Sequence, residues 1–147
     1  MAEHGTIIIG AGQAGYQVAA QLRLKGYEAP VILLGDEAHI PYQQPPLSKA
    51  YLKGELAGDR LPFRPENFYA DKDIDLRLTD AVTAIDPAAK TVTTAKGTLS
   101  YDTLVIATGG TPRRIPMPER LAGKTFTLKS RDDADALGAA LTDAKTV

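Results

Sequence analysis

A glycine-rich turn near the amino terminus has the residue types and spacing that phosphate binding requires. The chain reads Gly-Ala-Gly-Gln-Ala-Gly from Gly10 to Gly15, a complete G-x-G-x-x-G pattern. In such a turn the first glycine permits the tight bend, Gly12 leaves room for a pyrophosphate, and the last lets helix and strand pack closely. The N-terminus of the helix that follows would present free N–H groups and a partial positive charge to the phosphates. The pattern favours dinucleotide binding over a turn that only reverses the chain.

An acidic residue follows at the position where a ribose needs one. Asp36 comes after Gly15 by about 20 residues, the spacing expected for a ribose-binding acid. Its carboxylate would accept hydrogen bonds from the ribose diol and would repel a 2′-phosphate, which favours the unphosphorylated adenosine of FAD or NAD. Glu37 is an alternative for the same role, and a solvated turn acid is the reading without function.

Composition narrows the chemistry further. The 147 residues contain no cysteine, which excludes disulfides, thiolate metal sites and a dithiol relay, so redox chemistry requires a bound organic cofactor. Seventeen Lys and Arg against eighteen Asp and Glu predict no nucleic-acid partner. The first ten residues lack a signal or membrane pattern, and His4 and His39 have no partner at ligand spacing. We expect a cytoplasmic protein with no metal site and no membrane association.

The elements that must position the turn form a strand–helix–strand unit. A β-branched run at 6–9 precedes the turn, apolar residues at helical spacing predict a helix over 13–25, and a second apolar run covers 30–34. This order is typical of a βαβ unit with parallel strands.

Beyond this unit the chain changes to short strands. They are expected at 76–78, 82–85, 91–94, 98–101 and 103–107. The run from 82 to 101 leaves no room for helices between its strands, so it predicts an antiparallel meander. Short helices are expected at 47–53 and 64–71, a longer one at 132–141, and extended chain at 124–128 and 146–147. The predicted fold class is α/β, a Rossmann-like domain with a parallel sheet and an antiparallel β-meander, incomplete in this chain.

Three stretches carry a resemblance to a known family. IIIGAGQAGY at 7–16, DEAHIPYQQPPLSKAYLK at 36–53 and DTLVIATGGTPR at 102–113 resemble FAD-dependent, NADH-oxidising ferredoxin reductases of bacterial oxygenase systems. These enzymes are the putidaredoxin reductase type of the pyridine nucleotide-disulfide oxidoreductase superfamily. The PPLSK stretch is the most specific, and with the glycine turn it narrows the choice to this family and its apoptosis-inducing-factor-like relatives.

The resemblance implies roles for individual residues. Asp36 would hold the adenosine ribose, Val82 would pair with the adenine through its backbone, and Thr108 and Gly109 would pass close to the cofactor. Lys49 would lie beside the flavin ring as the catalytic residue, because an ammonium there stabilises the reduced anion. The implied FAD-binding residues are Gly10, Gly12, Gln13, Ala14, Gly15, Asp36, Glu37, Lys49, Val82, Ala107, Thr108, Gly109 and Arg113.

The resemblance also implies an activity, the transfer of electrons from NADH through FAD to a ferredoxin. Related disulfide reductases carry a cysteine pair where this chain has Leu47-Ser48-Lys49, so electrons would leave the flavin directly for a one-electron acceptor. Residues 1–118 would be the N-terminal portion of the FAD-binding domain, and 119–147 the crossing segment and the start of the NAD-binding domain. We expect the 147-residue chain alone to be inactive. The alternative function is a non-catalytic dinucleotide-binding fragment or a remnant without cofactor.

Overall fold

The computed structural model describes residues 4–142 and 144, and the chain divides into two compact units. The first unit comprises the chain up to Tyr42 together with Phe63–Gly109. The second comprises Gln43–Pro62 and the chain from Gly110 onward. The expected extended chain at 146–147 lies outside the described residues.

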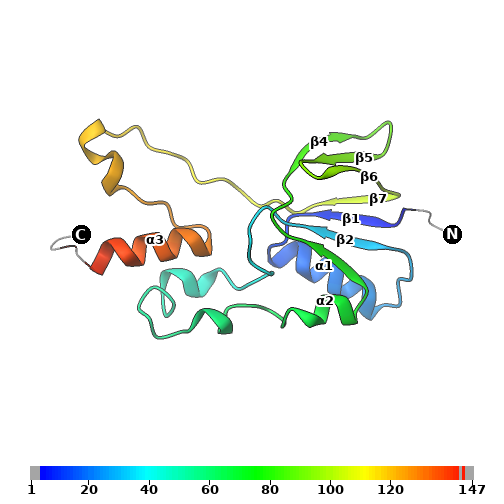
Figure 1. Ribbon diagram of the computed structural model, residues 1–147, viewed down its shortest axis with the longest axis horizontal. Coiled ribbons are helices and arrows are strands. Elements are labelled where there is room, and N and C mark those ends of the chain that lie inside the picture. Colours follow the sequence, from blue (N-terminus) through cyan, green and yellow to red (C-terminus); the bar gives the residue numbers. More distant parts are fainter. Residues whose placement is uncertain (1–3, 143, 145–147) are drawn as a thin grey trace. The chain divides into compact units, whose positions relative to one another are not determined.

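Four parallel strands form one of the two sheets of the first unit, in the order β3-β2-β1-β7 (Figure 1). They are β1 (Thr6–Ile9), β2 (Val31–Leu34), β3 (Ile74–Arg77) and β7 (Thr103–Ile106). Helix α1 (Gln13–Leu24) connects β1 to β2, which confirms the predicted strand–helix–strand unit. The central strand β1 is buried along its whole length, and this burial explains its run of three isoleucines after Thr6.

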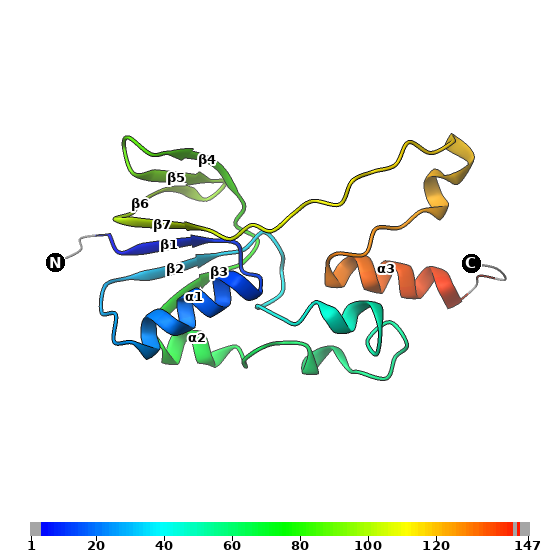
Figure 2. The same ribbon diagram turned by 180° about the vertical axis from the view of Figure 1, so that it is seen from behind.

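The two faces of this sheet have different covers (Figures 1 and 2). Because side chains alternate along a strand, Ile8 packs in one cluster with Tyr16 of α1 and Tyr69 of the short helix α2, whereas Ile7 packs with Val92 and Tyr101. Val92 belongs to an antiparallel meander, which confirms the predicted β-meander. The elements of these covers are α2 (Asn67–Asp71), β4 (Val82–Asp86), β5 (Thr91–Thr94) and β6 (Gly97–Ser100).

The described part of the second unit is built from short helical segments and one longer helix. They are the 3-10 helices η1 (Pro45–Ser48), η2 (Gly58–Arg60) and η3 (Glu119–Lys124), and helix α3 (Arg131–Thr142). The expected helix at 47–53 is wrong in its bounds, because η1 ends at Ser48 and turns follow. The extended chain expected at 124–128 is also wrong at its start, because Lys124 is the last residue of η3. Residues 125–128 form no regular helix or strand.

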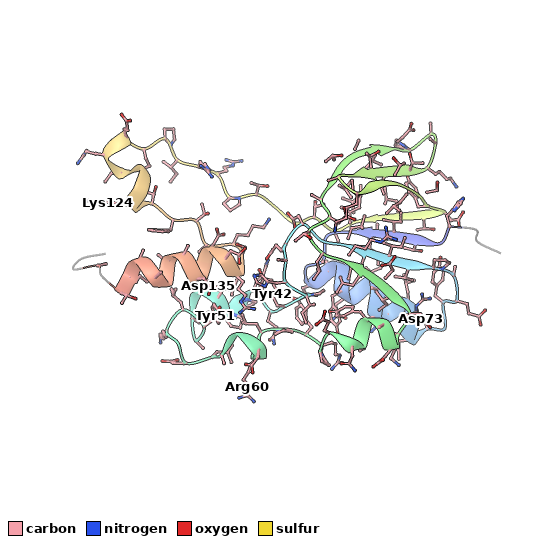
Figure 3. All side chains as sticks on the ribbon, in the orientation of Figure 1. Tyr42, Tyr51, Arg60, Asp73, Lys124 and Asp135 are labelled. Carbon is pink, nitrogen blue, oxygen red and sulfur yellow. The ribbon has the colours of Figure 1, made fainter. Side chains whose placement is uncertain are left out.

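Helix α3 is held by polar contacts at its amino end. The backbone amides of Lys129 and Ser130 donate to the Asp133 carboxylate at 2.8 and 2.9 Å, and the Asp133 amide donates to the Ser130 hydroxyl at 3.1 Å. These hydrogen bonds lower the pKa of Asp133 and form a reciprocal helix cap. In the same unit, the Tyr51 hydroxyl donates to Asp135 of α3 at 2.6 Å, and the two side chains meet in Figure 3.

Candidate functional site

A cavity of about 120 Å³ lies in the first unit, at the carboxyl ends of the parallel strands. Strands β1 and β2 end at two of its lining residues, and others follow β3 and β7 or begin β4. It is lined by Ile9, Gly10, Leu34, Asp36, Asp80, Ala81, Val82 and Thr108. Open α/β sheets bind their ligands at this edge. Four of the sequence-predicted residues, from four separate segments, therefore meet in one place: Gly10, Asp36, Val82 and Thr108.

The three glycines of the turn are required for different reasons. Gly10 has a φ of +107°, and a Cβ there would lie 2.3 Å from the Ala107 carbonyl oxygen. A Cβ on Gly15 would lie 1.9 Å from the Gly10 carbonyl oxygen. Gly12 has an ordinary φ of −81°, and a Cβ there would meet no atom within 4 Å. Packing of the fold thus requires the first and third glycines, whereas the open space at Gly12 is free for a molecule from outside the chain.

The amino end of α1 is open to an anion. Gly12 is the N-cap residue and supplies no side-chain hydrogen bond, and no acidic residue lies in the first turn. Gln13 and Ala14 are exposed. The first amides of a helix have no partner within it and carry a partial positive charge. This helix end, with the vacant space at Gly12, fits a phosphate group of a dinucleotide.

The two neighbouring acids, Asp36 and Glu37, differ in their hydrogen-bond partners. The hydroxyl of Tyr42, a buried residue, donates a hydrogen bond of 2.7 Å to the Glu37 carboxylate. Asp36 lines the cavity, is exposed, and makes no hydrogen bond to another side chain in the described part of the chain. Asp36 is therefore the acid of the pair whose carboxylate is open to a ligand.

The remaining predicted residues divide between the two units. The Ala107 amide donates to the Ile9 carbonyl at 2.7 Å, which ties the end of β7 to the end of β1, directly before the glycine turn. Gly109 ends the first unit with a φ of +67°. Lys49 and Arg113 belong to the second unit. Lys49 is exposed just after η1, and its ammonium has no ion pair with any described residue. Arg113 lines a separate cavity of about 370 Å³. Their roles at a flavin stay predictions.

Sequence reasoning missed four lining residues, Ile9, Leu34, Asp80 and Ala81, of which Asp80 is the one with an ionisable side chain. Asp80 is 1% exposed, and neither of its carboxylate oxygens has a hydrogen-bond partner. The rule that ligands bind at the carboxyl ends of parallel strands was the available signal, because this acid closely follows the strand expected at 76–78.

Two further kinds of site are absent from the residues that the structure describes. Within 4–142 and 144, no group of three or more His, Asp or Glu side chains is placed to hold a metal ion. None of the described helices is both long and apolar enough to cross a membrane.

Comparison with known proteins agrees with this geometry. Residues 4–147 match the family model described as pyridine nucleotide-disulphide oxidoreductase. The chain is 46% identical to a probable ferredoxin reductase, CtmF, of Castellaniella defragrans, covering 99% of this chain and 36% of that protein. It is 43% identical to the 5,5′-dehydrodivanillate O-demethylase ferredoxin reductase subunit of a Sphingobium species, covering 95% and 34%.

Solved structures give the same relationship. The covalent putidaredoxin reductase–putidaredoxin complex superposes with a TM-score of 0.87 at 39% identity, over 96% of this chain and 35% of that chain. The chain thus spans about a third of the length of the relatives it matches. The matched family model, the parallel sheet and the glycine turn together establish that this chain belongs to the pyridine nucleotide-disulphide oxidoreductase family.

Proposed function

We propose that this chain binds FAD and forms the FAD-binding portion of a reductase that passes electrons from NADH to a ferredoxin. The observation that supports it best is the vacant space at Gly12, next to the uncapped amino end of α1 and to the cavity that Asp36 lines. Relatives named as ferredoxin reductases support the electron acceptor. Bound FAD would supply the chemistry, accepting a hydride and releasing single electrons.

Each part of the site has its own task in this proposal. The amides from Gly12 to Ala14 bind the pyrophosphate, and Asp36 accepts hydrogen bonds from the adenosine ribose. The backbone of Val82 pairs with the adenine, while Thr108 and Gly109 pass beside the cofactor. The other predicted residues, Gly10, Gly15, Lys49, Ala107 and Arg113, keep the FAD-binding roles that the resemblance implies. Glu37 is left out of the site because it accepts a hydrogen bond from Tyr42.

The proposal includes an organisation of the chain and a location. Residues 1–118 form the N-terminal portion of the FAD-binding domain, and 119–147 form a crossing segment and the start of an NAD-binding domain. NADH is the co-substrate of the whole reductase and a ferredoxin its partner. We place it in the cytoplasm, where NADH is supplied.

The test is a titration of the purified chain with FAD and with ADP. Quenching of flavin fluorescence on binding, and competition by ADP at the same site, are the expected results, because the described cavity suits the adenosine half. A folded chain that binds neither FAD nor ADP would instead be the remnant without cofactor, and the proposed function would be wrong.

Asp36→Ala should weaken ADP binding by roughly 5- to 150-fold, the equivalent of about 1 to 3 kcal/mol for lost hydrogen bonds to a charged group. Isothermal titration calorimetry measures the change. The matched control is Glu37→Gln, which keeps an acceptor for Tyr42 and should leave ADP affinity near that of the unmodified chain. If Glu37→Gln weakens ADP binding and Asp36→Ala does not, the ribose acid is Glu37.

Lys49→Met, in a reductase that contains this chain, should slow reduction of the flavin by NADH about tenfold or more while changing FAD affinity less. The physical reason is that the ammonium interacts most strongly with negative charge that appears on reduction. Stopped-flow absorbance measures the rate, and Lys49→Arg, which retains the charge, is the control. Equal rates for Lys49→Met and the unmodified reductase would remove Lys49 from the mechanism.

A further inference from the structure

The carboxyl group of Asp80 receives no hydrogen bond from the described part of the chain. Its side chain is 1% exposed, both oxygens lack a hydrogen-bond partner, and the residue lines the cavity with Asp36 and Val82. Its backbone amide donates to the Gly35 carbonyl at 2.9 Å, so the position is fixed against the end of β2. A buried polar group left unpaired costs about 1 to 3 kcal/mol, and more when charged. The fold thus keeps a costly group in the cavity wall.

The basic side chains on neighbouring segments are engaged elsewhere. Arg77 donates twice to Asp75, at 2.7 and 3.0 Å, and the Lys96 ammonium donates to the Leu78 carbonyl at 2.9 Å. The pKa of Arg77 is raised chiefly by its hydrogen bond to Asp75 and to a smaller degree by the charge of Asp80. Asp80 therefore acts on Arg77 only through space, and its hydrogen-bonding capacity remains unused.

In the proposed site, Asp80 belongs to the end that takes the base of an adenosine rather than to the end that takes its phosphates. It lies two residues before Val82, the proposed partner of the adenine, whereas the phosphates are proposed to lie at the amino end of α1. At the 6-position of the purine, adenine carries a hydrogen-bond donor, its exocyclic amino group, whereas guanine carries the O6 acceptor. A carboxylate accepts a hydrogen bond from the amino group of adenine and repels the O6 oxygen of guanine. Side-chain rotamer changes are common on binding, and one of them would turn the enclosed carboxylate toward the base.

We propose that Asp80 is a specificity-determining residue that accepts a hydrogen bond from the amino group of adenine, so that the cavity selects adenine over guanine nucleotides. The inference rests on the proposed function and deepens it, because it assigns base recognition to a side chain beside the backbone of Val82. It also gives the cavity two acidic lining residues, Asp36 and Asp80.

The test compares ADP with GDP by calorimetry on the unmodified chain and on Asp80→Asn. The expected result is a strong preference for ADP in the unmodified chain and a ratio of affinities at least tenfold smaller in Asp80→Asn, since a hydrogen bond to a charged group is lost. Asp75→Asn is the matched control: this acid lies on β3, is exposed and does not line the cavity. Its ADP-to-GDP ratio should equal that of the unmodified chain.

A change in the ligand provides the second measurement, and its first part uses only the unmodified chain. Purine riboside 5′-diphosphate lacks the amino group, and it should bind the unmodified chain at least tenfold more weakly than ADP. This loss should be smaller in Asp80→Asn, because the two deletions remove the same interaction. If ADP binds but neither the ADP-to-GDP ratio nor the loss on removing the amino group differs in Asp80→Asn, the inference fails alone. If the folded chain binds neither ADP nor GDP, the proposed function fails with it.

Discussion

Gly12→Val abolishes binding of FAD and ADP while the first unit keeps its fold; this is the largest functional effect that we expect from a single substitution. With a φ of −81° and no atom within 4 Å of a Cβ, the position accepts a side chain without backbone strain and without collision at its Cβ. The valine side chain then fills the space that a pyrophosphate needs. We expect a loss of affinity of 100-fold or more, and a fall of about 1 kcal/mol in stability, because valine is a poor N-cap residue.

Two measurements on the same sample separate binding from folding in this variant. Calorimetry with FAD and ADP reports the affinity, and urea unfolding followed by circular dichroism reports the fold. Gly123→Val is a suitable control, since a Cβ on Gly123 also meets nothing within 4 Å and the residue lies in the second unit. Unchanged FAD affinity in Gly12→Val would mean that the turn does not bind the pyrophosphate.

Gly10→Ala, two residues away, should act on folding stability rather than on ligand binding. We expect it to destabilise the first unit by about 2 to 6 kcal/mol. Its φ of +107° is a conformation that costs other residues about 1 to 3 kcal/mol. In addition, the new Cβ would lie 2.3 Å from the Ala107 carbonyl oxygen, and relieving such overpacking costs about 1 to 3 kcal/mol more. The two strands that meet here, β1 and β7, would have to separate. Urea unfolding measures the loss.

The control for Gly10→Ala isolates the collision from the backbone strain. Gly26 also has a positive φ, +76°, but a Cβ there meets nothing within 4 Å. Gly26→Ala should therefore show the conformational cost alone and lose less stability than Gly10→Ala. Equal losses in the two variants would show that the close approach of Ala107 to the turn is not what requires Gly10.

The sequence alone predicted those features that depend on near neighbours in the chain. The strand, glycine turn and helix from Thr6 to Leu24 were predictable because burial on both faces of β1 favours β-branched residues throughout the strand and because a tight turn requires Gly10. The meander was predictable because its turns leave no room for helices between β4, β5 and β6. The helix expected at 47–53 had incorrect bounds, since after Ser48 turn hydrogen bonds replace a regular helix.

Tertiary structure decided the features that depend on which distant segments meet. Which of the two acids, Asp36 or Glu37, has an unoccupied carboxylate depends on Tyr42, which folds back onto Glu37 and donates its hydroxyl hydrogen to that acid at 2.7 Å. Asp80 lines the cavity because β3 pairs with β2, which brings the end of one strand beside the end of the other. Sequence spacing reports the local conformation of each strand but not its neighbour in the sheet, because pairing is selected by burial of the whole unit.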